Sequence, residues 1–318
     1  LTGLHACRRN AHYVVRDGVI ELLDDVTGRI AAGRVWSRGL HTVVALKEGL
    51  KPAVDTDTAA QITFQRFFQR YWRLGGLSGT LFEARQELKT AMGASVVRIP
   101  LHLSSQRKEL PMYLFDNAEA RWDAVCKRVS ALRSAGRPVL VGTDSVADSE
   151  RLSERLQAAG VAHRVLNALN DADEADIVAA AGRAGQVTVA TRMAGRGTDI
   201  KLDAAARIAG GLHVLSCQQN PSSRLDRQLA GRAARHGDPG SAESWLLWSS
   251  SEMTADPLWH QSTLWKICRK TFRSMQFASL IRAVNQRREE HRRALLRREL
   301  LRQDQEWERR LSFAGLSS

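Results

Sequence analysis

Apolar and polar positions follow their most regular pattern between residues 136 and 248. Short apolar runs there alternate with stretches in which apolar residues recur every three or four positions, a pattern typical of strands alternating with amphipathic helices. The expected strands are 138–142, 161–166, 187–190, 212–216 and 243–248, and the expected helices are 146–159, 174–184 and 222–234. This alternation predicts right-handed crossovers and therefore an α/β fold with a parallel sheet.

The pattern before this region predicts smaller elements. Residues 12–29 read as a β-hairpin with Asp17-Gly18 at its turn, because that dipeptide suits a two-residue turn. Apolar and aromatic positions at helical spacing predict helices over 56–74 and 81–91. The first helix carries an aromatic stripe that we expect to be buried, made of Phe64, Phe67, Phe68, Tyr71 and Trp72.

Two further features concern the region between residues 96 and 118. Val96–Ile99 reads as a strand that Pro100 ends. Residues 101–117 are polar and irregular and precede a helix expected over 118–135, so we place a domain boundary near 105–118.

The chain from Trp259 onward is helical in pattern and polar. Residues 281–310 contain ten arginines against six acidic residues and an interrupted apolar seam. A solvated helix that packs on a partner explains this most simply, because charge runs are usually solvated faces. An RNA or lipid surface is the alternative.

Composition narrows the class of protein. The 318 residues, 43% of them hydrophobic, suffice for two compact domains. A formal net charge of +13 suits an anionic partner such as a nucleotide, nucleic acid or acidic lipid headgroups. The four cysteines show no C-x-x-C spacing, so we expect reduced thiols and no zinc site. No apolar run reaches the length of a membrane span, no signal peptide is recognisable, and the first residue, Leu1, suggests a piece of a longer protein.

The strongest candidate site lies between Val187 and Gly240. The strand ending at Ala190 opens into a glycine-rich loop that contains Arg196, Gly197 and Asp199, and ligands of parallel sheets bind at such strand ends. Arg232 and Arg235 are three residues apart in a helical pattern, so both guanidinium groups should leave one face and could clamp a polyphosphate. Each cluster alone could equally be a flexible loop or a solvated basic helix.

An acidic motif for magnesium is rejected on its context. Asp173-Glu174-Ala175-Asp176 spells the magnesium-binding sequence of many ATPases, but that motif requires an apolar strand directly before it. The strand here ends near Asn167, so we expect the acids to open a helix and stabilise its N-terminus.

In these clusters the sequence resembles the SecA family, the ATP-driven motors of bacterial preprotein export. The resemblance is strongest at 138–143, 190–201, 210–214 and 224–240, and weaker segments extend it over about residues 12–310. It implies the second RecA-like nucleotide-binding domain of a superfamily 2 helicase-type motor, with a partial first domain and C-terminal helices. The implied domains are the tail of the preprotein-binding insertion (1–50), the end of the first nucleotide-binding domain (51–117), the second nucleotide-binding domain (118–252) and the start of the helical scaffold (253–318).

The resemblance also implies roles for single residues around ATP. Arg196, Gly197, Asp199 and Gln228 would contact the nucleotide, Arg232 and Arg235 would act as arginine fingers, and Ser78, Gly79 and Thr80 would couple hydrolysis to domain movement.

The chain also departs from the family pattern. Arg192 replaces a usual Asn, Ala234 replaces a usual Gly, which we expect to stiffen a helix there, and a Thr-Asn-Arg-Pro segment after Pro100 is missing. No Gly-Lys-Ser/Thr phosphate loop occurs in the sequence. We therefore expect a missing N-terminal half, or a companion polypeptide, to hold the phosphates and Mg²⁺.

Three functions follow as hypotheses. The leading one is an incomplete SecA-like translocation ATPase, inactive alone, on the cytoplasmic face of the bacterial inner membrane. Its implied partners are preprotein substrates, a membrane protein-conducting channel and acidic phospholipids. The second hypothesis is half of an RNA helicase, since such helicases use similar glycine-arginine clusters and the chain is basic. The third is a non-catalytic relative that only binds a partner.

Overall fold

The computed structural model describes residues 7–24, 30–31, 33–36, 39–51, 62–167, 174–191, 198–247 and 275–312. Contacts within the chain separate two compact units. The first comprises residues 1–55, 103–219 and 229–279, and the second comprises 56–102, 220–228 and 280–318.

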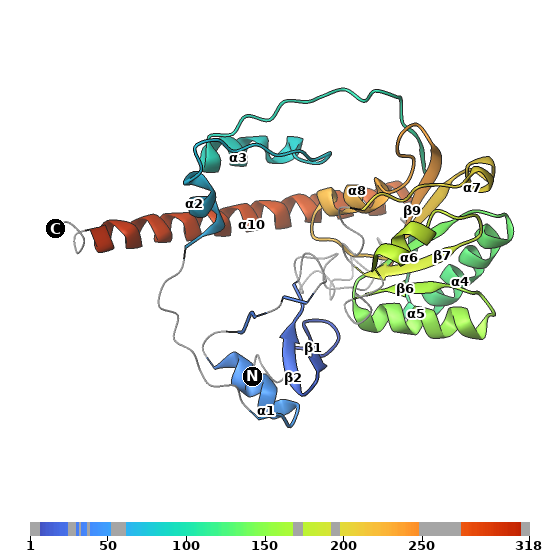
Figure 1. The fold of residues 1–318 in the computed structure, drawn as a ribbon, viewed down its shortest axis with the longest axis horizontal. Coiled ribbons are helices and arrows are strands. Elements are labelled where there is room, and N and C mark those ends of the chain that lie inside the picture. The colour runs from blue at the N-terminus through green and yellow to red at the C-terminus, as the bar shows by residue number, and fades with distance from the viewer. Residues whose placement is uncertain are drawn as a thin grey trace. The chain divides into compact units, whose positions relative to one another are not determined.

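A parallel sheet forms the core of the first unit (Figure 1). Its strand order is β3-β9-β8-β5-β7-β6, and β4 also pairs with β9. The strands are β3 (Gln106–Glu109), β4 (Tyr113–Phe115), β5 (Val139–Thr143), β6 (Arg164–Leu166), β7 (Val187–Thr191), β8 (Leu212–Ser216) and β9 (Pro239–Leu247). The helices of this unit are α4 (Ala118–Ser134), α5 (Val146–Ala158), α6 (Glu174–Ala180) and α7 (Ala204–Ile208), whereas most of α8 (Ser223–Ala230) belongs to the second unit. All the ladders in this sheet are parallel, so the α/β fold predicted from the alternation is confirmed.

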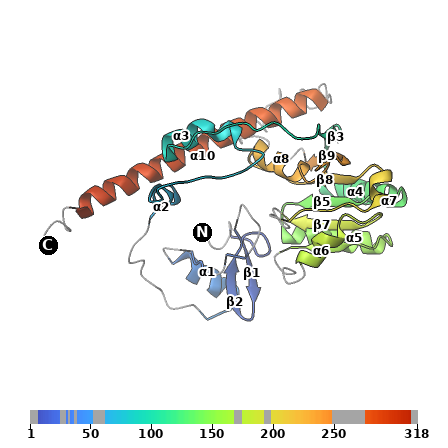
Figure 2. The same cartoon turned by 45° about the horizontal axis from the view of Figure 1, so that its top comes forward.

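The central strands are buried on both faces. Val139 and Val141 of β5 belong to one apolar cluster with the inner faces of α4 and α5, whereas Leu140 belongs to a second cluster with α6 and α7. Successive strand side chains point to opposite faces, so each central strand contributes to both clusters. Figure 2 shows β8, β5 and β7 side by side in the order that the pairing gives. This burial explains why the central strands are apolar runs that the sequence reveals.

A chain of hydrogen bonds crosses β8 and β9 inside this unit. The His213 ring lies between Ser241 Oγ, 2.8 Å from Nδ1, and Glu243 Oε1, 2.9 Å from Nε2. Arg137 Nη2 donates to Ser241 Oγ at 2.9 Å, and Arg128 Nε donates to Glu243 Oε1 at 2.8 Å. These partners assign the proton of a neutral His213 to Nε2, because Nδ1 accepts from the serine hydroxyl and Nε2 donates to the carboxylate.

This network makes the stability of the first unit depend on pH. Burial lowers the pKa of His213 below 6.5, so on acidification the unfolded chain takes up this proton before the folded chain does. Burial alone would raise the pKa of Glu243, but hydrogen bonds from His213 and Arg128 lower it below 4.5. We expect the free energy of unfolding to fall as the pH drops below 6.5, and to fall further below 4.5.

Thermal unfolding followed between pH 8 and pH 4 checks this expectation, with His213→Gln as the matched variant. The glutamine can hydrogen-bond but does not titrate, so the step near neutral pH should shrink in the variant. An unchanged step would show that other groups cause it.

The N-terminal part of the first unit is a hairpin followed by a helix. Strands β1 (Tyr13–Arg16) and β2 (Val19–Leu22) pair antiparallel around Asp17 and Gly18, whose φ angles of 51° and 73° are those of a type I′ turn. Helix α1 (Leu40–Lys47) packs Val44 against the buried ring of Tyr13. The predicted hairpin and its turn are confirmed.

The second unit consists of helices along α10 (Met275–Ser312), namely α2 (Phe64–Gln69) and α3 (Arg85–Met92), the latter preceded by a short 3-10 turn (Figures 1 and 2). Thr63 Oγ1 donates to Asp304 of α10 at 2.6 Å, and Arg297 of α10 binds both carboxylate oxygens of Glu87 on α3. The helix predicted over 81–91 is confirmed, and the helical pattern after Trp259 is confirmed from Met275; residues 248–274 lie outside the described part.

The expectation of a buried aromatic stripe in the second unit is wrong. In the described residues the helix expected over 56–74 covers only Phe64–Gln69, and the aromatic side chains of the stripe range from 36% exposed to fully exposed. The rings contact one another, with Phe67 lying 5.4 Å from Phe68 between centroids, rather than a core. The spacing revealed a shared face but not what covers it.

Other element predictions need correction in the region before α4. Residues 96–99 are extended but pair with no strand in the described part of the chain. Conversely, the segment expected to be irregular over 101–117 contains β3 and β4, both paired with β9. Strand β3 is Gln-Arg-Lys-Glu at the sheet edge, where polar side chains are tolerated and no apolar alternation is needed. None of the described helices is long and apolar enough to span a membrane.

Candidate functional site

Strand β7 ends at Thr191, at the carboxyl edge of the parallel sheet, and the glycine-rich segment comes directly after it in the sequence. Residues 192–197, which include Arg192, Arg196 and Gly197, lie outside the described part of the chain. The described part resumes at Thr198 and Asp199, which lead through buried Ile200 into α7.

Both candidate arginine fingers reach this resumed segment within the first unit. Arg235 Nη1 donates to Asp199 Oδ1 at 2.7 Å, and Arg232 Nη1 donates to the Thr198 carbonyl at 2.8 Å. His236 Nε2 lies 3.0 Å from the other carboxylate oxygen of Asp199. The structure therefore brings together three residues that the sequence singled out: Asp199, Arg232 and Arg235.

The electrostatics of Asp199 follow from this convergence. Its partial burial alone would raise its pKa, but hydrogen bonds from Arg235 and His236 and their positive charges hold that pKa below 3.8. Asp199 is thus an anion at neutral pH that orients the Arg235 guanidinium. Since the Arg235 side chain is 44% exposed, its remaining donors face solvent, where an anionic ligand could bind.

The prediction that one helix carries both arginines is wrong. Helix α8 ends at Ala230, so Arg232 lies in a turn and Arg235 in the loop before β9. Ala234 and His236 have φ angles of 57° and 53°, in the left-handed region. The guanidinium groups reach the same segment because the loop turns back on itself, not because of helical spacing.

Ala234 stands where the SecA family usually has glycine, and its left-handed conformation changes what we expect of this replacement. We expected a stiffer helix, but the position lies outside α8, and a Cβ at positive φ is strained. Replacing Ala234 by glycine should therefore raise the free energy of unfolding by roughly 0.5–1 kcal/mol. Ala131→Gly, at an exposed position within α4, is the matched control and should lower that free energy by about 1 kcal/mol.

Thermal melts of both variants check this pair. An equal loss of stability in the two variants would contradict the strain at Ala234.

Gln228 and the Ser78-Gly79-Thr80 turn belong to the second unit, where they lie together. Gln228 Nε2 donates to Thr80 Oγ1 at 3.2 Å, and the Thr80 hydroxyl lies 3.4 Å from Ser78 Oγ. Among the described residues, no hydrogen-bond partner is seen for the buried Gln228 Oε1. A buried carbonyl of this kind is ready to accept a hydrogen bond from a ligand or an incoming chain.

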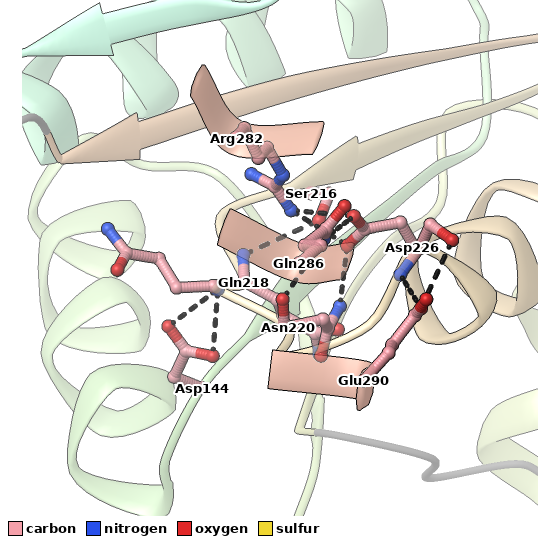
Figure 3. Close-up of polar contacts among 10 residues, drawn as sticks. Asp144, Ser216, Gln218, Asn220, Asp226, Arg282, Gln286 and Glu290 are labelled. Carbon is pink, nitrogen blue, oxygen red and sulfur yellow. Dashed lines mark hydrogen bonds and ion pairs between the residues drawn. The ribbon is translucent and has the colours of Figure 1, made fainter. Parts of the chain in front are cut away.

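Sequence reasoning missed a polar group at the carboxyl ends of β5 and β8. The Gln219 backbone N–H lies 3.0 Å from both carboxylate oxygens of Asp144, and Gln218 Nε2 donates to the Thr143 carbonyl at 3.0 Å. Figure 3 shows Asp144 and Gln218 of this group. Asp144 directly follows an apolar run, which is a signal that could have located it. This group connects two neighbouring strand ends at the ligand-binding edge.

The acidic residues do not gather into a metal site in the described structure. Glu174 and Asp176 occupy the first turn of α6, as expected for acids that open a helix, whereas Asp173 lies outside the described part. Nowhere in the described ranges do three His, Cys, Asp or Glu side chains meet as metal ligands could.

Comparisons with known proteins agree on one family. The family profile described as "SecA P-loop domain" matches residues 104–209 and 203–254, and "SecA preprotein cross-linking domain" matches residues 1–45. The chain is 43% identical over 314 residues to "Protein translocase subunit SecA 2" of Nitrosospira multiformis, covering 96% of this chain and 46% of that protein. It is 42% identical over 322 residues to the protein of the same name from Bordetella avium, covering 99% and 48%.

The chain thus spans about half the length of the curated relatives it matches. Among solved structures, the E. coli DEAD-box protein SrmB bound to RraA matches 46% of this chain and 79% of that chain, with 21% identity and a TM-score of 0.36.

Proposed function

The chain belongs to the SecA family of protein translocase subunits, and from this premise we propose that it forms one wall of an ATP site in a preprotein-exporting motor. The observation that carries the proposal is the convergence of Arg232 and Arg235 on Thr198 and Asp199 at the carboxyl edge of the parallel sheet. Ligands of parallel sheets bind at that edge, and paired guanidinium groups suit phosphates.

Each residue of this wall has a role in the proposal. Arg235, oriented by Asp199, would turn from that carboxylate to the phosphoryl group as negative charge develops on it, with Arg232 alongside. Arg196 and Gly197, in the loop before Asp199, would contact the nucleotide, as would Gln228, whose buried Oε1 can accept a hydrogen bond. The Ser78-Gly79-Thr80 turn would pass nucleotide-dependent movement on through its contact with Gln228.

The residues of this chain fit the nucleotide better than they fit its metal ion. Guanidinium groups and a buried acceptor suit phosphates and donors on ATP, but in the described residues no three metal-ligand side chains come together. The sequence also lacks a Gly-Lys-Ser/Thr phosphate loop. The proposal therefore assigns the phosphate loop and Mg²⁺ to a second wall supplied by other residues of the parent protein or by a companion chain.

Exposed apolar side chains of the second unit mark a surface on which the phosphate-loop half could pack. Phe64 and Trp72 are exposed, as are Val97 and Ile99 in the extended segment without a strand partner. Exposed apolar stretches of this kind mark interaction surfaces, and an unpaired extended segment can add to a sheet. We assign both to the surface on which the phosphate-loop half packs, within the domain order 1–50, 51–117, 118–252 and 253–318 expected from the sequence.

The partners of the complete motor belong to the same proposal. The profile match over residues 1–45 supports preprotein as a substrate, and a channel and acidic phospholipids at the cytoplasmic face of the inner membrane would follow from export. The test is ATP turnover by this chain mixed with the phosphate-loop half of a relative, with unfolded preprotein, acidic vesicles or RNA added. Stimulation by preprotein and vesicles supports export, whereas stimulation by RNA alone would favour the helicase hypothesis.

A further inference from the structure

Helix α10 presents a stripe of polar side chains to the 220–228 segment of the second unit. Arg282, Gln286 and Glu290 recur every fourth residue, which places them on one helix face. Figure 3 shows all three directed at the residues around Asp226. Gln286 is buried and the Arg282 side chain is only 13% exposed, so this face is an internal contact of the unit.

The Asp226 carboxylate is the centre of this contact. Arg282 Nη2 lies 2.8 Å from both carboxylate oxygens, Gln286 Nε2 donates to Oδ2 at 2.7 Å, and Asn220 Nδ2 donates to Oδ1 at 3.0 Å. Gln286 Nε2 also lies 3.1 Å from the Asn220 carbonyl. Charge-assisted hydrogen bonds of this type are strong and directional, so Asp226 fixes α8 and its preceding loop to α10.

A second contact holds the first turn of α8. Glu290 Oε1 accepts from the backbone N–H of Ser223 at 3.1 Å and lies 3.3 Å from its hydroxyl. The carboxylate satisfies an N–H that a helix leaves unpaired and lies at the positive end of the helix dipole. Helix α10 therefore fixes α8 at two points that are three residues apart.

The residue held in place by these contacts is Gln228. It lies two positions after Asp226 on α8 and donates to Thr80, whose turn is followed by α3. Helix α3 is itself tied to α10 through Glu87 and Arg297. Both sides of the Gln228–Thr80 contact are thus anchored to the same long helix.

We propose that Asp226 is a positioning residue through which α10 sets the Gln228–Thr80 contact. Movement of α10 relative to α8 would withdraw Gln228 from Thr80, and the chain reaches Arg232 only four residues later. Asp226, Arg282 and Gln286 act through Gln228 rather than on the nucleotide. The consequence for ATP rests on the proposed function, whereas the positioning itself does not.

Hydrogen exchange of the 318-residue chain, without nucleotide, tests the positioning. Arg282→Gln should speed amide exchange about tenfold in peptides covering 224–230 and 78–81, the loss expected when a charged hydrogen-bond partner is removed. Arg282→Lys keeps the charge and should restore part of the protection. Arg292→Gln is the control, because Arg292 pairs with Glu289 on the exposed side of α10 and should leave both peptides unchanged.

Asp226→Asn, which keeps the side-chain size, provides a second variant and should resemble Arg282→Gln. Unchanged exchange at 78–81 in both variants would overturn the proposal. So would faster exchange that extends equally to the β5 strand, because that pattern reports loss of folding rather than of position.

Turnover in a sample completed with a phosphate-loop half separates this inference from the proposed function. Arg282→Gln should lower kcat about tenfold, since a misplaced Gln228 loses the contact that links the nucleotide to Thr80. Unchanged kcat would overturn the effect on ATP. Absence of turnover with the unaltered chain would instead count against the proposed function, and the exchange measurement would still decide the positioning.

Discussion

Arg235→Ala is expected to lower ATP turnover of the completed site by about a thousandfold or more, the range typical of a lost arginine finger. Arg235 is oriented by Asp199 at 2.7 Å and is partly exposed, so it can reach charge that develops on a phosphoryl group. Its exposed ion pair contributes little to stability, and the variant should fold normally. Arg235→Lys should recover little of the activity, because an ammonium cannot replace a planar fork of donors.

Steady-state turnover of the chain mixed with a relative's phosphate-loop half measures this effect. Arg207→Ala is the matched control, because Arg207 also forms an exposed ion pair in the first unit, with Asp238. If the Arg235→Ala and Arg207→Ala variants had equal ATP turnover, Arg235 would have no catalytic role. A rise in KM with kcat unchanged would limit the role of Arg235 to nucleotide binding.

Glu243→Ala is expected to destabilise the first unit by about 3–5 kcal/mol, the cost of breaking a buried ion pair by removing one partner. The Glu243 side chain is 2% exposed and accepts from both His213 and Arg128. Its removal leaves the buried His213 Nε2–H without its acceptor and Arg128 without its counter-charge. The midpoint of thermal unfolding should fall by roughly 10 °C for a unit of this size.

Glu119→Ala provides the control for this prediction. Glu119 pairs with Arg155 on the surface, and its side chain is 63% exposed, so its removal should cost less than about 1 kcal/mol. If the Glu243 and Glu119 variants had the same midpoint of thermal unfolding, the buried network would not stabilise the sheet.

The central sheet could be predicted from the sequence because its strands carry their own signal. Val139–Thr143 and Val187–Thr191 are buried on both faces, so each appears as a mostly apolar run without a charged residue. Strand β3 carries no such signal, because Gln106–Glu109 lies at the edge of the sheet and owes its structure to pairing with β9. Edge strands are defined by their neighbour more than by their own composition.

Three residues of the candidate site could be selected together from the sequence, but their geometry could not be predicted. The sequence singled out Asp199, Arg232 and Arg235, and the structure brings them together. It could not show that α8 ends at Ala230 or that Ala234 adopts a left-handed conformation, because a loop held by tertiary contacts leaves no periodic pattern. Periodicity also reveals which residues share a face without showing whether that face is covered, which is why the aromatic stripe was misjudged.

The polar stripe on α10 illustrates a signal that was present and missed. Arg282, Gln286 and Glu290 stand at four-residue spacing. We instead interpreted this helix by its apolar seam and its arginines. Their partners Asp226 and Ser223 are more than fifty residues earlier in the chain. Spacing can identify such a face, but only the fold shows what it contacts.

The central claim is that these residues form one wall of an ATP site whose second wall lies elsewhere. Magnesium-dependent ATP turnover of the 318-residue chain tests it most directly, measured alone and after mixing with the part of the Nitrosospira multiformis relative that this chain does not match. The proposal predicts negligible turnover alone and clear turnover after mixing, which Arg235→Ala abolishes. Robust turnover by the chain alone, abolished by the same substitution, would contradict it.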